Sequence, residues 1–248
     1  MYFTLCIPTM DRYDVFLKNY LPKYIENSLI NEIIITDENG NDIDKINNSN
    51  IDKTKLKLYK NNNRLGPFMN KLTACKYSSN EWIALIDSDN FADENYFKIS
   101  RDYINTISNT NYDIISPSFA QPNFDYRHLN GKIINKQNLS DIVKYDHFNK
   151  GNKTGIETLM NTGNYILNKK LINEINLDNE TQNIKYSSAC DVIYFNTLLF
   201  EQFNLQFHII SDLSYIHNVH NDSIYMKTHH HFTDFNALIH NRFKSLYN

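Results

Sequence analysis

The chain has 248 residues, of which 41% are hydrophobic and 21% charged, a composition typical of a folded protein with the core of one large domain. Its 25 basic and 28 acidic residues give a net charge of −3 without a basic stripe, which argues against a nucleic-acid partner. Three cysteines without paired spacing argue against a disulfide framework, and no apolar run approaches the ~20 residues of a membrane span, so we expect a cytoplasmic protein.

Apolar runs and helical patterns alternate over the first half of the chain. The runs that predict strands are residues 3–7, 33–36, 55–59, 82–86 and 113–117. The patterns that predict helices are residues 12–27, 67–77 and 93–107. Asp11 and Asp93 are suitable N-caps, Pro67 suits a first helical turn, and Pro22 predicts a kink or break. This alternation predicts an α/β fold with a mostly parallel sheet.

The alternation ends after residue 117, and residues 119–153 have an irregular pattern. Within them, Asn130-Gly131 separates residues 126–129 from 132–134, which is typical of a two-residue hairpin turn. We therefore expect a side hairpin or lid here, and an acceptor pocket built from the same segment. Further strands are expected at residues 164–167, 207–210 and 214–219. Further helices are expected up to Phe203, with Ser187 or Ser188 as the cap, and at residues 235–246.

Two aspartates follow the apolar run Trp82–Ile86. Five apolar residues with polar flanks predict a strand buried on both faces of a parallel sheet. The ligand crevice of an open α/β sheet lies outside the carboxyl ends of its strands, so Asp87 and Asp89 can meet a cation and the phosphates it carries. Asp37 ends a second strand at the same edge. The alternatives are a turn that caps the next helix for Asp87 and Asp89, and an Asx turn for Asp37.

The order of these segments resembles that of the family 2 glycosyltransferases, which have the GT-A fold. The segments that carry the resemblance are FTLCIPT, EIIITDENG, NNNRLGPFMNKLTA, WIALIDSDN, SACDVIYFNTLLF and YIHNVHNDSIY. The resemblance implies one domain over residues 1–248, with a central, mostly parallel sheet flanked by helices. It further implies a nucleotide-sugar-binding half at about residues 1–117 and an acceptor-binding half at about residues 118–248.

The resemblance also assigns residues to the donor site. It implies that Pro8 and Thr9 line the nucleotide pocket and that Asp37 reads the nucleobase. Ser88 is expected in the donor site between the two aspartates. Arg64 either holds a phosphate or forms a salt bridge within its loop. The donor implied is a nucleotide diphosphate sugar, with UDP as the expected nucleotide.

A metal site is implied around the acidic pair. Asp89 is the expected direct ligand, with Asp87 facing the ribose or a metal-bound water. A late histidine often completes this site, and we favour His220 over His217 because it stands three residues before Ser223, as in the family. Alternatively, both histidines are polar residues at the end of a strand. Oxygen ligands with one imidazole suit Mn²⁺ or Mg²⁺, with the imidazole favouring Mn²⁺.

The resemblance implies that Asp191 is the catalytic base. An acidic pair opens a late helix in this family, and here that pair is Cys190-Asp191, so Asp191 alone remains to accept the proton of the incoming hydroxyl. The alternative is an acidic residue favoured in a first helical turn by the helix dipole. A single base without a covalent nucleophile implies inversion at the anomeric carbon. Asn90 and Cys190 depart from the family pattern, so substrate details are not transferred from better-known members.

The leading hypothesis is therefore a metal-dependent, inverting glycosyltransferase that acts on a glycan or glycosylated acceptor. A sugar nucleotidyltransferase is a rival, but CIPTMDRYD lacks the glycine-rich loop that a triphosphate would need. A non-catalytic carbohydrate-binding protein on the same fold is the second rival. His229, His230 and His231 are interpreted as surface residues, because three consecutive side chains point in different directions. The sequence leaves the oligomeric state open.

Overall fold

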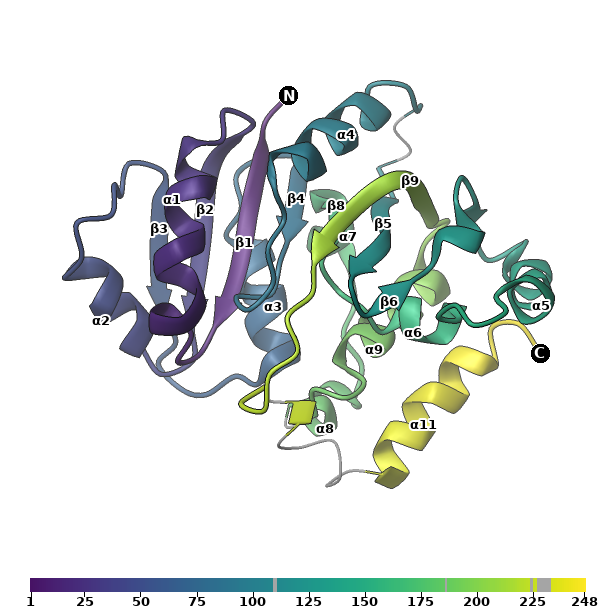
Figure 1. The fold of residues 1–248 in the computed structure, drawn as a ribbon. Helices are drawn as coiled ribbons and strands as arrows, with labels where there is room; N and C mark the ends of the chain where they lie inside the picture. The colour runs from purple at the N-terminus through teal and green to yellow at the C-terminus, as the bar shows by residue number, and fades with distance from the viewer. Residues whose placement is uncertain (109–110, 186, 224, 227–232) are drawn as a thin grey trace.

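A computed structural model gives the fold and describes residues 1–108, 111–185, 187–223, 225–226 and 233–248. The histidines 229–231 lie outside these residues. One mixed sheet crosses the molecule, with helices on both of its faces (Figure 1). In the described ranges, no helix combines the length and apolar character that a bilayer crossing needs.

The sheet sets the position of the functional residues. Its strands are β1 (Phe3–Thr9), β2 (Ile30–Asp37), β3 (Leu56–Lys60), β4 (Trp82–Leu85), β5 (Asp113–Gln121), β6 (Phe124–Asp125), β7 (Ile133–Ile134), β8 (Ile166–Asn168) and β9 (Gln206–Ile216). The order is β3-β2-β1-β4-β8-β5-β9-β7, and β6 pairs with β5. Strands β1 to β4 are parallel, β8 runs antiparallel between β4 and β5, and β9 is parallel to β5. Therefore β1, β2, β4, β5 and β9 all end at one edge of the sheet.

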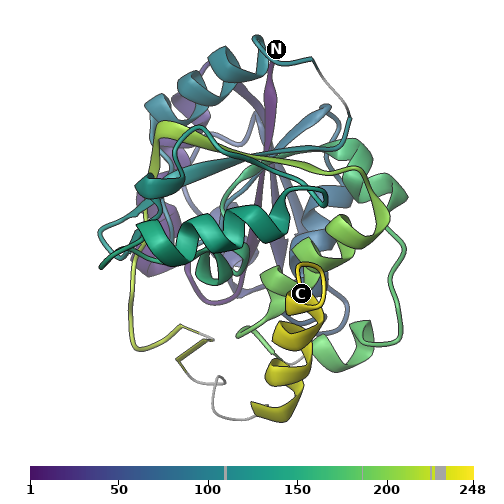
Figure 2. The same ribbon diagram turned by 90° about the vertical axis from the view of Figure 1, so that its right-hand side faces the viewer.

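The helices pack on the two faces of this sheet. They are the π-helical η1 (Tyr13–Leu17), α1 (Lys18–Glu26), α2 (Asn41–Asn47), α3 (Pro67–Lys76), α4 (Glu94–Ile104), the 3₁₀ turn η2 (Arg127–Leu129), α5 (Leu139–Asn149), α6 (Ile156–Met160), α7 (Lys169–Glu174), α8 (Thr181–Ile184), α9 (Asp191–Gln202) and α11 (Thr233–Lys244). Figure 2 shows α11 on the outside of the molecule, and it packs against α9.

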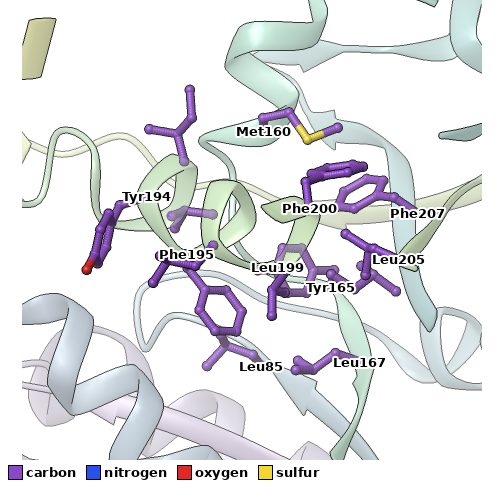
Figure 3. Packing of buried hydrophobic residues seen from close by; sticks show 14 of the residues in the cluster. Leu85, Met160, Tyr165, Leu167, Tyr194, Phe195, Leu199, Phe200, Leu205 and Phe207 are labelled. Atoms are coloured by element: carbon purple, nitrogen blue, oxygen red, sulfur yellow. The ribbon is translucent and has the colours of Figure 1, made fainter. Parts of the chain in front are cut away.

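Alternating side chains of each strand feed two separate cores. On β1, Leu5 and Ile7 join the core beneath α1 and α4, whereas Cys6 joins the core beneath α3 and α9. The second core is the larger, and Figure 3 shows its centre, where Phe195 and Leu199 of α9 face the sheet. Because α9 is buried along most of its length, the position of its first residues is fixed by packing.

Most expected strands and helices are confirmed, with changed ends. Asp93 caps α4, because its carboxylate accepts the Tyr96 N–H. Helix α1 continues through Pro22 without a break. The two expected late strands form the single strand β9, with Asp212 at a positive φ of 63° between them. Helices α2 and α5 to α8 were not expected; α2 and α6 to α8 have seven residues or fewer, too few for a helical period to be recognised.

Three local predictions are wrong. Residues 126–129 and 132–134 do not pair as a hairpin, because residues 127–129 form a 3₁₀ turn and β7 pairs with the edge of β9. Asp11 does not cap the first helix. It has a φ of 56°, and its carboxylate accepts hydrogen bonds from the side-chain amides of Asn39 and Asn41. Neither Ser187 nor Ser188 is the N-cap of α9, since the helix begins one residue after Cys190.

Candidate active site

A cleft of about 850 Å³ lies at the edge where the parallel strands end. Both halves of the chain line it. The predicted site residues that line it are Pro8, Thr9, Arg64, Asp87, Ser88, Asp89, Asp191 and His217. His220 contacts Asp89 beside the cleft, and Asp37 lies behind its wall. From the segment 119–153, where the sequence predicted an acceptor pocket, only Phe124 lines the cleft; α6, α11 and the N-terminus of α9 form that wall.

Asp87 is held by an asparagine that precedes β8. The Asn164 Oδ1 atom accepts the Asp87 N–H at 2.7 Å, and the Asn164 amide nitrogen donates to Asp87 Oδ2 at 3.3 Å. Because β8 is antiparallel, its first residues lie at the edge where β4 ends. Asn164 also has φ 85°, a backbone conformation that asparagine tolerates better than most residues. Sequence reasoning missed Asn164, since only the antiparallel pairing brings it to Asp87.

Lys71 of α3 lies between Asp87 and Asp191 and forms an ion pair with each of them. Its Nζ atom lies 2.9 Å from Asp191 Oδ2 and 3.2 Å from Asp87 Oδ1. Burial alone would lower the pKa of this ammonium group, but the two carboxylates outweigh burial and raise it. Burial raises the pKa of Asp87, and Lys71 opposes that rise. Sequence reasoning missed Lys71, although its place one turn after Pro67 puts it near the helix end that faces the cleft.

Asp191 is the first residue of α9 and is almost completely buried. A carboxylate in this position is favoured by the positive end of the helix dipole. Lys71 occupies Oδ2, whereas Oδ1 makes no hydrogen bond to the described residues. The preceding Cys190 is buried, and burial raises the pKa of its thiol to about 11. Cys190 is therefore neutral, and Asp191 is the ionisable oxygen group of this pair.

Asp89 and His220 form the part of the site that a cation would use. The His220 Nε2 atom lies 3.0 Å from Asp89 Oδ2, and the ring of His220 packs against Phe16. The Nδ1 atom of His217 is buried without a hydrogen-bond partner, and burial lowers the pKa of this imidazole so that it favours the neutral form. Among the described residues, no group of three histidine, cysteine or acidic side chains could hold a metal by itself.

Asn218 fastens the segment that carries both histidines. Its side chain donates to the Asp89 carbonyl at 2.5 Å and to the Tyr20 hydroxyl at 3.0 Å. Its backbone N–H donates to Asn90 Oδ1 at 3.0 Å. Asn90, which departs from the family pattern, therefore holds the segment that follows β9. Sequence reasoning missed Asn218, because no motif links it to residues about 130 positions earlier.

Asp37 has a structural role in the position where the sequence predicted a nucleobase contact. Its Oδ1 accepts the N–H of Asn39, and its Oδ2 accepts the N–H groups of Asp42 and Ile43 at the start of α2. Asp42 in turn accepts the Thr9 hydroxyl and the first N–H groups of η1. Asp37 thus shapes the turn between β2 and α2, as in the Asx-turn alternative.

Glu38 lines the cleft where Asp37 does not. Its Oε2 accepts the Leu65 N–H at 2.8 Å, whereas its buried Oε1 has no hydrogen-bond partner. Burial raises the pKa of Glu38, and the Leu65 N–H and the charge of Arg64 oppose that rise. An unpartnered buried carboxylate oxygen is costly unless a ligand supplies a donor. Arg64 lines the same side of the cleft.

Comparisons with known proteins bear on the family and the fold. The model of glycosyl transferase family 2 matches residues 4–175. No curated protein matches the chain. The match stops before Asp191, so the geometry alone connects Asp191 and His220 with the acidic pair.

Solved structures share the fold at low sequence identity. The Staphylococcus aureus TarS 1–349 complex with UDP-GlcNAc has a TM-score of 0.65 at 14% identity, covering 98% of this chain and 66% of that one. The TarS 1–349 structure without a named ligand covers 87% and 59%, with a TM-score of 0.59. This chain therefore spans less than two thirds of the TarS chains. Glucosyl-3-phosphoglycerate synthase from Mycobacterium tuberculosis, with Mn²⁺, UDP and glucosyl-3-phosphoglycerate, has a TM-score of 0.58 at 10% identity, covering 99% and 80%. The fold is GT-A.

Proposed function

Because this chain belongs to glycosyl transferase family 2, we propose that it transfers a sugar from a UDP-linked donor to a hydroxyl group of a glycan or other acceptor. The observation that carries this proposal is the convergence of Asp87, Asp89 and Asp191 on one cleft, with His220 in contact with Asp89 beside it. Residues 1–117 supply the donor side and residues 118–248 the acceptor side. UDP is supported by the UDP complexes of TarS and the mycobacterial synthase.

The donor side offers contacts for each part of a nucleotide diphosphate sugar. Glu38 is suited to accept an N–H from the nucleobase, the role that the resemblance had implied for Asp37. Arg64 supplies positive charge for the diphosphate. Pro8, Thr9 and Ser88 line the space between them.

The cation site fits a divalent metal that completes its shell with phosphate oxygens. Asp89 and His220 already lie within hydrogen-bond distance of each other and would be the two protein ligands. This donor set of oxygen and imidazole suits Mn²⁺ or Mg²⁺. When bound, such a cation would offset the charge that develops on the departing diphosphate.

Asp191 supplies the base. Its Oδ1 takes the proton of the acceptor hydroxyl as the new bond forms between the acceptor oxygen and the anomeric carbon. The bond from that carbon to the phosphate oxygen breaks at the same time, and its electron pair leaves with the nucleotide diphosphate. Attack from the face opposite the leaving group inverts the anomeric configuration. Lys71, bound to Oδ2, orients the Asp191 carboxylate and leaves Oδ1 for the acceptor hydroxyl.

A thermal-shift panel of UDP-sugars with and without Mn²⁺ tests the proposal. A bound donor raises the apparent stability by mass action, so at least one donor should raise Tm. Asp89→Ala should lose the Mn²⁺-dependent part of the shift, whereas Asp141→Ala, which removes an exposed carboxylate of α5, should keep it. No shift with any donor would refute the proposal. Retention of configuration in an NMR spectrum of the product would exclude inversion, and binding without transfer would favour the non-catalytic rival.

A further inference from the structure

Helix α11 forms a wall of the cleft on the far side of Asp191. Asn236 and His240 are four residues apart, which places them on the same face of the helix, and both line the cleft. The helix is fixed in place, because Arg242 forms ion pairs with Asp178 at 2.6 Å and with Glu201 at 2.5 Å. It lies outside the part of the chain that the family model matches.

The amide of Asn236 has a fixed orientation beside the proposed base. Its Oδ1 accepts the Ser187 hydroxyl at 3.0 Å and the Cys190 thiol at 3.1 Å. Both donors belong to the turn that leads into Asp191. With Oδ1 directed at that turn, the amide nitrogen is left without a hydrogen-bond partner in the described part of the chain.

His240 presents a second unpartnered group one turn further along α11. Its imidazole makes no hydrogen bond to the described residues, and burial lowers its pKa, which favours the neutral ring. A neutral imidazole has one donor and one acceptor nitrogen, so it can either donate a hydrogen bond to a hydroxyl group or accept one from it. Glu157 lines the same wall, and its carboxylate is paired with Lys244 at 3.5 Å and accepts the Tyr247 hydroxyl. Polar groups that converge on a cleft without protein partners are typical of a ligand site.

We propose that Asn236 and His240 form an acceptor subsite that binds the neighbouring hydroxyl groups of an uncharged sugar ring while Asp191 deprotonates the reacting hydroxyl. This inference rests on the proposed transferase function. The amide nitrogen of Asn236 donates to one hydroxyl oxygen, and His240 binds the next. Because the Asn236 amide and the neutral His240 ring carry no charge, the subsite is suited to a neutral sugar rather than to a phosphorylated small molecule.

Acceptor kinetics test the subsite. The probes are methyl glycosides of glucose, galactose, mannose and N-acetylglucosamine, compared with glycerol 3-phosphate and 3-phosphoglycerate. Asn236→Ala and His240→Ala should each raise the acceptor KM about three- to tenfold, the loss expected for one hydrogen bond, while the donor KM stays unchanged. Leu238→Ala, on the exposed face of α11, is the matched control and should change neither constant.

A second variant keeps the test valid if Asn236→Ala fails to fold. Asn236→Asp retains the oxygen that accepts Ser187 and Cys190 but removes the donor, so it should fold and still raise the acceptor KM. An unchanged acceptor KM in both Asn236 variants, with donor turnover intact, overturns the subsite alone. Transfer to the phosphorylated probes in preference to the methyl glycosides, or to none of the neutral probes, also overturns it. A wild-type protein that neither binds nor hydrolyses any UDP-sugar refutes the transferase function itself.

Discussion

Replacing Lys71 with methionine tests the charge balance of the cleft. The Lys71 side chain is 17% exposed and lies between Asp191, which is 4% exposed, and Asp87, which is 29% exposed. Methionine keeps the length of the side chain but leaves two carboxylates without the cation between them. Removing one partner of a buried ion pair costs about 3–5 kcal/mol. Because Asp87 is partly exposed, we expect a loss near 3 kcal/mol in the free energy of unfolding at neutral pH.

The loss should depend on pH in a defined direction. Burial already raises the pKa of Asp87 in the folded protein, and without the opposing charge of Lys71 it rises further above the value in the unfolded chain. Between the pKa of the unfolded chain and that of the folded protein, the folded protein binds more protons than the unfolded chain. Its stability therefore falls as the pH rises through this interval and recovers as the pH falls. The destabilisation by Lys71→Met is therefore expected to be smaller at pH 5 than at pH 8.

Urea unfolding at pH 5 and pH 8 measures this effect. Lys71→Arg should retain most of the stability, because it keeps the charge. The double variant Lys71→Met/Asp191→Asn should recover much of the loss at pH 8, because it removes one of the two uncompensated carboxylates. An equal loss at both pH values, without recovery in the double variant, would refute the electrostatic reasoning and attribute the effect to packing.

Three further predictions follow from the same cleft. Asp191→Asn should lower transfer about 10²- to 10⁴-fold in a UDP-release assay while the UDP-sugar thermal shift persists; unchanged turnover would remove Asp191 as the base. Glu38→Ala should weaken UDP binding about tenfold or more by isothermal titration, since a charged hydrogen bond is lost, and an unaltered Kd would exclude Glu38 from the nucleobase site. Burial lowers the pKa of His240 below its usual 6.5, so the unfolded chain takes up a proton that the folded protein does not, and stability falls as the pH drops. His240→Gln should therefore lose less stability than the wild type between pH 7.5 and pH 5.5 in urea unfolding; an equal loss would contradict this.

The sheet and its acidic edge were predictable from the sequence because they depend on local patterns. Each apolar run of the donor half is a strand, and the end of each parallel strand reaches the same edge regardless of the loops between them. That rule alone places Asp87 and Asp89 at a cleft. The late strand β9 was also expected, and its parallel direction carries His217 to the same edge.

The remaining site residues depend on contacts that no local pattern contains. Lys71 meets Asp191 across 120 positions, and Asn218 meets Asp89 across 129. One position along the chain decides whether an acidic side chain at this strand end lines the cleft, as Glu38 does, or binds the backbone of its own turn, as Asp37 does. The predicted hairpin failed for a similar reason, because the open edge of β9 offers residues 133–134 a better partner than the nearby chain.

Residues 176–248 have a consequence for exchanging parts between members of this family. They carry the proposed base and the two histidines, and their contacts with the first half of the chain include the Lys71–Asp191 ion pair, the hydrogen bonds of Asn218 and the bond from the Arg12 side chain to the Asp222 carbonyl. A graft of this segment onto another donor half would move acceptor choice as one unit. Its success would depend on whether the recipient has suitable residues at positions 12 and 90. These residues contact the segment that carries the grafted histidines and so fix its position.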